Sequence, residues 1–431
     1  MASSDGESVF FESRGVFHLR LSLDGSVLFA GARDALYAFD ALTGMQKWSF
    51  TFTPLQKPRT TPLVTASFVI IAAGASILAM DSASGNVSWS SPMPHEVQSI
   101  ALTPDSSTII AASTQGVIWG INATDGRLRW NYTQQTPVQS GGDGGAGDIR
   151  ISADGTTIYY TVAQVSNATV HAIKVSGVIA THLWTHELSV GASVAASPPA
   201  LSADGSMLFV CVTSDVVRLV ALSTATGTPK WTFNITGPAA NPLATPATPT
   251  VGTDGAIYIS TASDGVVCSL SATGSKRWEY PTRLAARTTL ALTSDGSGLY
   301  VGGKSDSQLQ YSVLYAVDTR LGSKSWEFRT TTFVTSIVSN GDDSTVFATD
   351  GEYLYAVEGT VIATRSPTAG RPPTASPGPA GGGSDDGGNK TKGIVIGVVA
   401  ALPVILVIVI AVFIVIKRNR FKESTNVVNT L

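Results

Sequence analysis

The chain has 431 residues, of which 14% are charged, and its formal net charge is −3 at pH 7. This balance provides no basic field to neutralise phosphates, which argues against nucleic-acid binding and against strong attraction to an acidic membrane surface. The 42 glycines, with abundant Thr, Ser and Val, suit short strands joined by tight turns rather than a helical protein. The composition therefore predicts an all-β chain.

The first predicted elements are four short strands, which cover 17–22, 26–32, 35–41 and 46–52. An Asp24-Gly25 turn follows the first strand, and a Thr43-Gly44 turn follows the third. Asp-Gly between apolar runs is a strong hairpin signal because the turn needs residues that accept a positive φ. We name the strands A to D, from the innermost to the outermost, and predict that they form one antiparallel sheet.

The same unit recurs along the chain. Seven units end in a tryptophan, at intervals of 41 to 54 residues: Trp48, Trp89, Trp130, Trp184, Trp231, Trp278 and Trp326. An eighth unit, 353–365, lacks the tryptophan, and only Trp119 is out of phase. One such sheet cannot bury both faces, whereas sheets arranged in a ring bury each face against a neighbour. We therefore predict an eight-bladed β-propeller over residues 8–365, with seven blades as the alternative.

The units share the motif A-x-D-x-x-T-G-x-x-x-W. The first unit matches the motif in full, at Ala38, Asp40, Thr43, Gly44 and Trp48. The units that end at Trp89 and Trp326 match with one substitution each. This motif resembles the pyrrolo-quinoline-quinone-like (PQQ-like) repeat of quinoprotein alcohol dehydrogenase-like propellers, and the resemblance covers residues 20–360. It implies a tryptophan that packs between blades, and Asp and Thr-Gly residues that shape a hairpin.

The resemblance does not by itself imply a bound cofactor. Quinone-dependent dehydrogenases of this superfamily need a carboxylate base, a calcium ion and often a vicinal cysteine pair. Cys211 and Cys268 are far apart in sequence, and no Asp or Glu stands out as the base. Both cysteines lie in apolar strand-like runs, which favours buried free thiols, with a disulfide between adjacent strands as the alternative. Other members of the class are binding scaffolds, so we expect neither a cofactor nor enzymatic activity.

The predicted propeller has two unlike faces. The A–B and C–D turns share one face, which we call the turn face. The B–C loops and the D-to-A crossings share the other, which we call the crossing-loop face. The crossing loops are long and irregular, and such loops on a rigid scaffold are the usual place for binding. We therefore expect a protein or glycan ligand on the crossing-loop face, where the candidate residues are Lys57, Arg59, Asp143, Asp148, Arg283 and Arg287.

Other polar patterns favour structural roles. Five B–C loops carry an aspartate: Asp34, Asp215, Asp264, Asp306 and Asp350. A ring of carboxylates would hold a cation, but turn formation is the commoner role of such residues. The glycine-rich segment 140–148 lacks the Gly-Lys-Ser/Thr ending of a phosphate loop. His182 and His186 lie in a strand or turn rather than on a helix, which disfavours a metal site. We predict no metal ligand and no catalytic residue.

The C-terminal part has a different composition. Residues 366–392 are rich in Pro, Gly, Ser and Thr and predict an extended stalk. Residues 393–416 contain 24 residues without a charge, enough for a single transmembrane helix of about 36 Å. The tail, 417–431, begins with KRNRFK, so it is predicted to be cytoplasmic and residues 1–365 extracytoplasmic. Gly393 and Gly397 have the spacing of a helix-pair contact and indicate a weak dimer.

The predicted orientation normally requires an N-terminal signal peptide, and the first residues do not show one. We favour a truncated or mis-started gene product; an unusual signal and a tail-anchored protein with a cytosolic head are the alternatives. Glycosylation acceptor triplets favour the outside. Those expected to be exposed begin at Asn86, Asn131, Asn167, Asn234 and Asn389, whereas Asn122 occupies the Asp position of its repeat and is the least suited.

Three functions are consistent with these patterns. The first is a single-pass membrane protein, at the cell surface or in a lumen, whose propeller binds a protein or glycan. The second is a quinoprotein-like oxidoreductase that uses the central funnel. The third is a lumenal folding or assembly factor. We favour the first.

Overall fold

The structure, a computed structural model, describes residues 11–12, 16–58, 60–113, 115–134, 149–164, 167–190, 195–213, 217–235, 248–260, 265–282, 284–305 and 312–358. The chain divides into two compact units, Met1–Ile396 and Gly397–Leu431, and every described residue belongs to the first. The predicted stalk, transmembrane helix and tail lie outside the described residues. Within the described ranges, no helix is long and apolar enough to cross a membrane.

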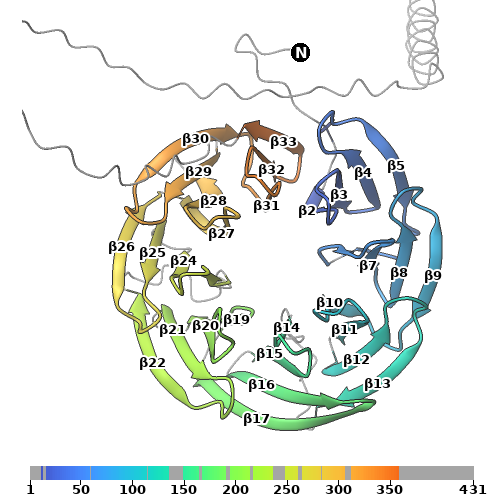
Figure 1. The fold of residues 1–431 in the computed structure, drawn as a ribbon, viewed down its shortest axis with the longest axis horizontal. Coiled ribbons are helices and arrows are strands. Elements are labelled where there is room, and N and C mark those ends of the chain that lie inside the picture. Colours follow the sequence, from blue (N-terminus) through green and yellow to red (C-terminus); the bar gives the residue numbers. More distant parts are fainter. Residues whose placement is uncertain are drawn as a thin grey trace, which may run out of the picture. The chain divides into compact units, whose positions relative to one another are not determined.

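The described strands form eight antiparallel sheets that stand as blades around a central channel (Figure 1). The strands of blade 1 are β2 (Val16–Leu21), β3 (Val27–Ala32), β4 (Ala35–Asp40) and β5 (Gln46–Thr51). Those of blade 2 are β6 (Leu63–Val64), β7 (Phe68–Ala72), β8 (Ser76–Asp81) and β9 (Val87–Pro92). Those of blade 3 are β10 (Val97–Leu102), β11 (Thr108–Ser113), β12 (Val117–Asn122) and β13 (Leu128–Thr133). Those of blade 4 are β14 (Arg150–Ile151), β15 (Thr157–Gln164), β16 (Asn167–Ser176) and β17 (Ile179–Val190).

The second half of the ring repeats this order. Blade 5 has a divided inner strand and consists of β18 (Ala195–Ala196), β19 (Ala200–Leu201), β20 (Met207–Thr213), β21 (Val217–Ser223) and β22 (Pro229–Ile235). Blade 6 consists of β23 (Thr250–Val251), β24 (Ile257–Ser260), β25 (Val266–Leu270) and β26 (Lys276–Pro281). Blade 7 consists of β27 (Leu284–Leu292), β28 (Gly298–Ser305), β29 (Ser312–Asp318) and β30 (Lys324–Thr330). The prediction of an eight-bladed propeller built from antiparallel sheets of four strands is confirmed.

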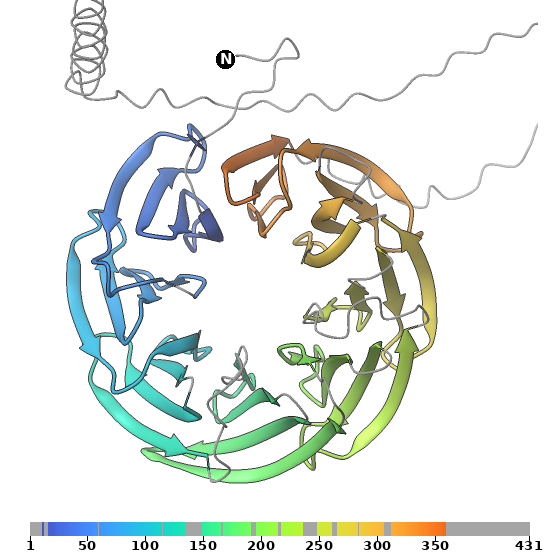
Figure 2. The same cartoon turned by 180° about the vertical axis from the view of Figure 1, so that it is seen from behind.

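Blade 8 takes its fourth strand from the other end of the chain. It contains β31 (Ser336–Ser339), β32 (Thr345–Thr349) and β33 (Tyr353–Glu358), and its outer strand is β1 (Phe11–Glu12). In the antiparallel register, Phe11 stands opposite Leu354. The sequence pattern assigned the eighth unit to 353–365 and did not indicate which segment forms its outer strand. The N-terminal strand joins the last sheet to the chain start, and this pairing closes the ring where blades 8 and 1 lie side by side (Figure 2).

The A–B turns are shaped by hydrogen bonds to an aspartate. In blade 1, Asp24 accepts a hydrogen bond from the Ser22 hydroxyl at 2.6 Å and another from the Ser26 backbone N–H at 3.1 Å. These bonds, that from the Ser22 hydroxyl first, lower the pKa of Asp24 to about 2 because they favour the charged carboxylate. Gly25 completes the turn at a φ of +72°, a conformation that glycine adopts at little cost.

In five blades the C–D turn packs beneath the tryptophan of the preceding blade. Trp48 of blade 1 donates its Nε1–H to the Ser82 carbonyl of blade 2 at 3.1 Å. Gly85 in the same turn has a φ of +74°, and a Cβ placed there would lie 2.6 Å from the Trp48 ring. The motif glycine is therefore required twice, for the backbone conformation and for the close approach of the indole. We call this contact the Trp–Gly latch.

The latch recurs around much of the ring. Three further latches combine the indole hydrogen bond with the glycine contact, namely Trp184 with Thr224 and Gly227, Trp231 with Ala272 and Gly274, and Trp278 with Thr319 and Gly322. Trp89 packs on Gly126 without a hydrogen-bond partner for its Nε1. Trp130 lies against its cross-strand partner Gly120, and Gly177 in the hairpin of blade 4 has nothing within 4 Å of a Cβ placed on it.

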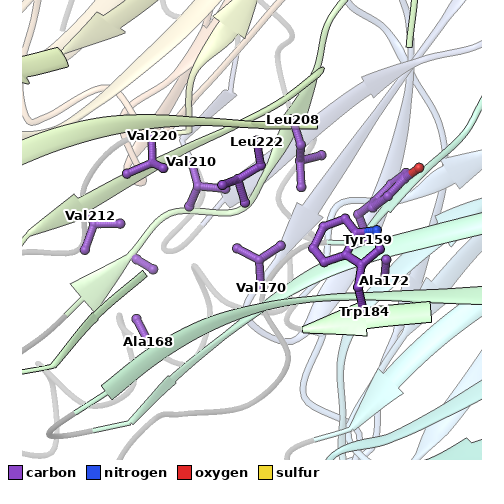
Figure 3. Packing of buried hydrophobic residues seen from close by; sticks show 11 residues of the cluster. Tyr159, Ala168, Val170, Ala172, Trp184, Leu208, Val210, Val212, Val220 and Leu222 are labelled. Carbon is purple, nitrogen blue, oxygen red and sulfur yellow. The ribbon is translucent and has the colours of Figure 1, made fainter. Parts of the chain in front are cut away.

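The hydrophobic core consists of eight layers, one between each pair of neighbouring blades. Figure 3 shows the layer between blades 4 and 5, where Trp184 and Tyr159 of blade 4 face Leu208 and Leu222 of blade 5. The rings of Trp184 and Tyr159 are 6.0 Å apart between centroids. The layer between blades 8 and 1 completes the circle. Each sheet therefore depends on both neighbours to remove its apolar faces from water.

Candidate functional site

The crossing loop between blades 1 and 2 is one of the described parts of the predicted binding face. The Gln56 side chain accepts hydrogen bonds from the Thr53 backbone N–H at 3.2 Å and from the Thr53 hydroxyl at 3.1 Å, which folds the loop into a turn. Gly74 in the B–C loop of blade 2 donates its backbone N–H to the Lys57 carbonyl at 3.0 Å. The loop is thus fixed to blade 2, with the Lys57 side chain exposed.

The same loop presents an apolar residue that the sequence reasoning missed. Leu55 is 90% exposed, although its carbonyl lies so close to blade 2 that a Cβ on Gly74 would be 2.6 Å away. A loop whose backbone is hydrogen-bonded therefore exposes a leucine and a lysine two positions apart. The signal in the sequence was a leucine in a loop otherwise composed of polar residues and prolines.

Of the other predicted binding residues, only Arg287 lies within the described ranges. Arg59, Asp143, Asp148 and Arg283 lie outside the described residues. Arg287 lies in β27, the inner strand of blade 7. Its placement in a strand that borders the channel differs from the loop position that we expected. Their grouping on one binding face stays a prediction.

The predicted ring of aspartates is not a set of equivalent residues. Asp350 is 2% exposed, and its carboxylate accepts hydrogen bonds from the Thr331 hydroxyl at 2.7 Å, from the Tyr355 hydroxyl at 2.8 Å and from three backbone N–H groups. It holds the crossing loop between blades 7 and 8, which exposes Phe333. Asp34 is exposed, and the remaining members lie outside the described residues. Asp350 is therefore engaged in structure rather than available to a cation.

The glycosylation acceptors differ in accessibility. Asn86, Asn131 and Asn234 are exposed. Asn167 is only half exposed, and its Oδ1 is buried without a hydrogen-bond partner. Asn122 uses its Oδ1 to accept the Thr124 backbone N–H at 2.9 Å, as the aspartates of the other repeats do. Asn389 lies outside the described residues.

Both cysteines are buried free thiols in the layer between blades 5 and 6. Burial raises the pKa of the Cys211 thiol to about 12, so it stays protonated at neutral pH and is not a nucleophile. The alternative of a disulfide between them is not what the structure shows.

Two of the histidines, His171 and His182, share a hydrogen-bond network through the Thr185 hydroxyl. His171 is buried, stacks on Tyr160 and contacts the hydroxyls of Thr169 at 2.8 Å and Thr185 at 3.0 Å. Burial lowers its pKa to about 4. His182 contacts the Thr185 hydroxyl at 2.8 Å on the exposed side. No group of three metal-ligating side chains occurs among the residues that the structure describes.

The central channel contains a cavity of about 570 Å³ against blades 4 to 7. The cavity is lined by Arg150, Ala200, Leu201, Thr248, Pro249, Thr250, Val251 and Leu290. Arg150 on β14 is half-buried and donates from Nη1 to the adjacent Ile149 carbonyl at 3.1 Å. The described wall thus combines apolar side chains, three threonine or proline positions and one guanidinium.

The comparisons with known proteins agree with this architecture. The chain belongs to the PQQ-like repeat family described as outer membrane protein assembly factor BamB, which matches residues 12–179 and 166–381. A crystal structure of BamB from Moraxella catarrhalis is 16% identical with a TM-score of 0.59, and the match covers 80% of this chain and 98% of that one. The computationally designed Ika8 protein is 13% identical with a TM-score of 0.63, over 82% of this chain and 99% of that chain. These two likenesses establish the fold.

Curated relatives match only part of the chain. Outer membrane protein assembly factor BamB of Nitrosomonas eutropha is 31% identical over 129 residues, which are 29% of this chain and 30% of the relative. Serine/threonine-protein kinase AfsK of Streptomyces griseus is 30% identical over 149 residues, which are 31% of this chain and 17% of the kinase. The matched segments span less than a third of either relative, so they indicate shared repeats rather than a shared whole protein.

Proposed function

We propose that this protein is an extracytoplasmic protein-interaction module, anchored by one transmembrane helix at 393–416, whose crossing-loop face binds a protein partner. Membership of a family described as an assembly factor supports a scaffold rather than an enzyme. The observation that carries the proposal is the loop 53–58. It is fixed by hydrogen bonds and yet exposes 90% of Leu55 next to the exposed Lys57.

An exposed leucine on a loop that is already ordered loses little conformational entropy on binding. The free energy gained by burying its apolar surface therefore contributes to affinity. The neighbouring lysine supplies a charge that steers and orients a partner. On the turn face, by contrast, the motif residues are already engaged in turns and in Trp–Gly latches. The recurrent positions of the repeat build the scaffold, and the irregular loops are free to carry specificity.

Site-specific photo-cross-linking in the native cells tests the binding face. A photoreactive amino acid is placed at Leu55, and in a matched variant at Leu42, which is 82% exposed in a C–D turn on the turn face. We expect discrete protein adducts from position 55 and none from position 42, and Lys57→Glu should reduce the adduct at position 55. Adducts from position 42 alone would place the partner on the turn face and reject this proposal. A glycan ligand would give no protein adduct from either position.

Protease protection in sealed membrane vesicles tests the orientation. A protease added to the cytoplasmic side should remove an epitope tag placed after 431 and leave residues 16–358 intact. Digestion of the propeller from the cytoplasmic side would support the tail-anchored alternative and reject an extracytoplasmic head.

A further inference from the structure

The inner strands that border the channel have an unusual charge composition. The described inner strands are β2, β6, β10, β14, β18, β19, β23, β27 and β31, and none contains an aspartate or glutamate. The chain as a whole has 31 acidic residues against 28 basic ones. The inner strands nevertheless carry three arginines, Arg20, Arg150 and Arg287. The described inner strands are therefore basic in composition, in a protein that is slightly acidic.

Two of these arginines stand at one level of the ring. Arg20 pairs with Phe29 in blade 1 and Arg150 pairs with Tyr159 in blade 4, which are equivalent positions in their sheets. The equivalent residues of the other blades are small or apolar, including Ala200 and Thr250. Within the described part of the chain, no carboxylate lies within ion-pair distance of the Arg20 or Arg150 guanidinium.

Arg150 lies on the wall of the 570 Å³ cavity. This volume is within the range of small-molecule sites, which are about 300 to 1,000 Å³. Leu201, Val251 and Leu290 line the same cavity, so the lining combines apolar residues with the guanidinium. Within the described residues, the half-buried Arg150 guanidinium donates one hydrogen bond, to the neighbouring Ile149 carbonyl, which leaves most of its five N–H donors available.

We infer that this cavity binds an organic carboxylate, with the carboxylate on Arg150 and an aliphatic body against Leu201, Val251 and Leu290. A planar guanidinium recognises a carboxylate through two parallel hydrogen bonds, and these strengthen where water is partly excluded. The carboxylate belongs either to a free small molecule or to the C-terminus of a peptide, since both present the same group. The site lies in the channel, so it does not depend on the partner of the crossing-loop face.

The two mouths of the channel are not equivalent for such a ligand. The A–B turns on the turn face carry seven aspartates: Asp24, Asp105, Asp154, Asp204, Asp254, Asp295 and Asp342. Four of them have pKa values of about 2 because Ser or Thr hydroxyls and backbone N–H groups donate to them, so they are ionised at neutral pH. These charges repel an anion at that mouth.

Isothermal titration calorimetry on the purified full-length chain tests the site with four probes. The probes are hexanoate, 1-hexanol, an N-acetylated penta-alanine peptide with a free C-terminal carboxylate, and the C-terminal amide of the same peptide. We expect at least one carboxylate to bind, and its uncharged counterpart to bind at least about tenfold more weakly, because the counterpart lacks the charged hydrogen bonds. Binding of hexanoate alone identifies a free small molecule, and binding of the peptide acid alone identifies a chain terminus.

Arginine variants connect the binding to the named residue. Arg150→Gln should weaken the carboxylate probe by about tenfold or more. Arg150→Lys should retain part of the affinity, and Arg127→Gln, at an exposed arginine in the C–D turn of blade 3, should leave it unchanged. If Arg150→Gln does not fold, the lysine variant and the acid-to-amide comparison still decide the question. The inference is overturned if neither carboxylate binds at about 10 mM, if the uncharged probes bind equally well, or if Arg150→Gln binds as the natural chain does. Failure here would not affect cross-linking from position 55.

Discussion

The Trp–Gly latch predicts a large difference between two glycine substitutions that have the same backbone conformation. Gly85 and Gly25 have φ values of +74° and +72°, so an alanine at either position is forced into the left-handed region, which costs about 1–2 kcal/mol. At Gly25 there is nothing within 4 Å of the new Cβ, so no further cost arises. At Gly85 the Cβ would lie 2.6 Å from the Trp48 ring.

The indole must move to admit that methyl group. Displacing a packed side chain costs about 1–3 kcal/mol, and the hydrogen bond from Trp48 to the Ser82 carbonyl contributes about 1 kcal/mol more. Gly85→Ala should therefore lower the free energy of unfolding by about 3–6 kcal/mol, and Gly25→Ala by about 1–2 kcal/mol.

Urea unfolding of the full chain, followed by circular dichroism, measures both values. A double-mutant cycle isolates the contact, because Gly85→Ala in a Trp48→Ala background should cost no more than Gly25→Ala. Equal destabilisation by Gly85→Ala and Gly25→Ala in the natural background would refute the reasoning. It would mean that blade 2 does not depend on a close approach of the indole from blade 1.

Three further outcomes are expected. Removal of residues 1–12 should reduce hydrogen-exchange protection in β33, because its outer edge loses its partner strand, and leave β4 unchanged; equal protection in β33 would show that β1 does not close the ring. Burial lowers the pKa of His171 from 6.5 to about 4, so the unfolded chain takes up a proton that the folded chain does not, and stability is lost as the pH falls through that window. His171→Gln should therefore reduce the loss of unfolding free energy between pH 6.5 and 4 by up to about 3 kcal/mol. An unchanged pH dependence in this variant would show that other groups cause the loss. In a glycosylating host, Asn131→Gln should remove one glycan from the mass of the protein and Asn122→Gln none, because the Asn122 Oδ1 is engaged in its turn; the opposite pattern would contradict the structure.

The repeat was readable from the chain because its signals are local. Asp24 with Gly25 and Thr43 with Gly44 are turn sequences whose hydrogen bonds involve residues within a few positions. The recurrence of such turns ahead of most of the tryptophans, together with an eighth unit that lacks the tryptophan, predicted the number of blades. It also predicted that their faces must be covered by one another, since a lone amphipathic sheet cannot exclude water from both sides.

The partners across the ring were decided by tertiary structure. Nothing near Phe11 in the sequence indicates that it pairs with Leu354, because the distance between them in the chain carries no local signal. The same holds for the buried role of Asp350, which depends on a hydroxyl from Tyr355 and on the neighbouring crossing loop. Arg150 was one charged residue among 59 in the sequence, and only closure of the ring places it on a cavity wall.

The sequence by itself therefore determined the repeating unit, the number of blades and the need for a ring, because turn geometry and apolar periodicity act over a few residues. Tertiary structure alone decided which strand completes the last blade, which carboxylate is enclosed and which guanidinium faces the channel. These features depend on contacts between residues far apart in the chain, and they appear only when all eight sheets are packed side by side.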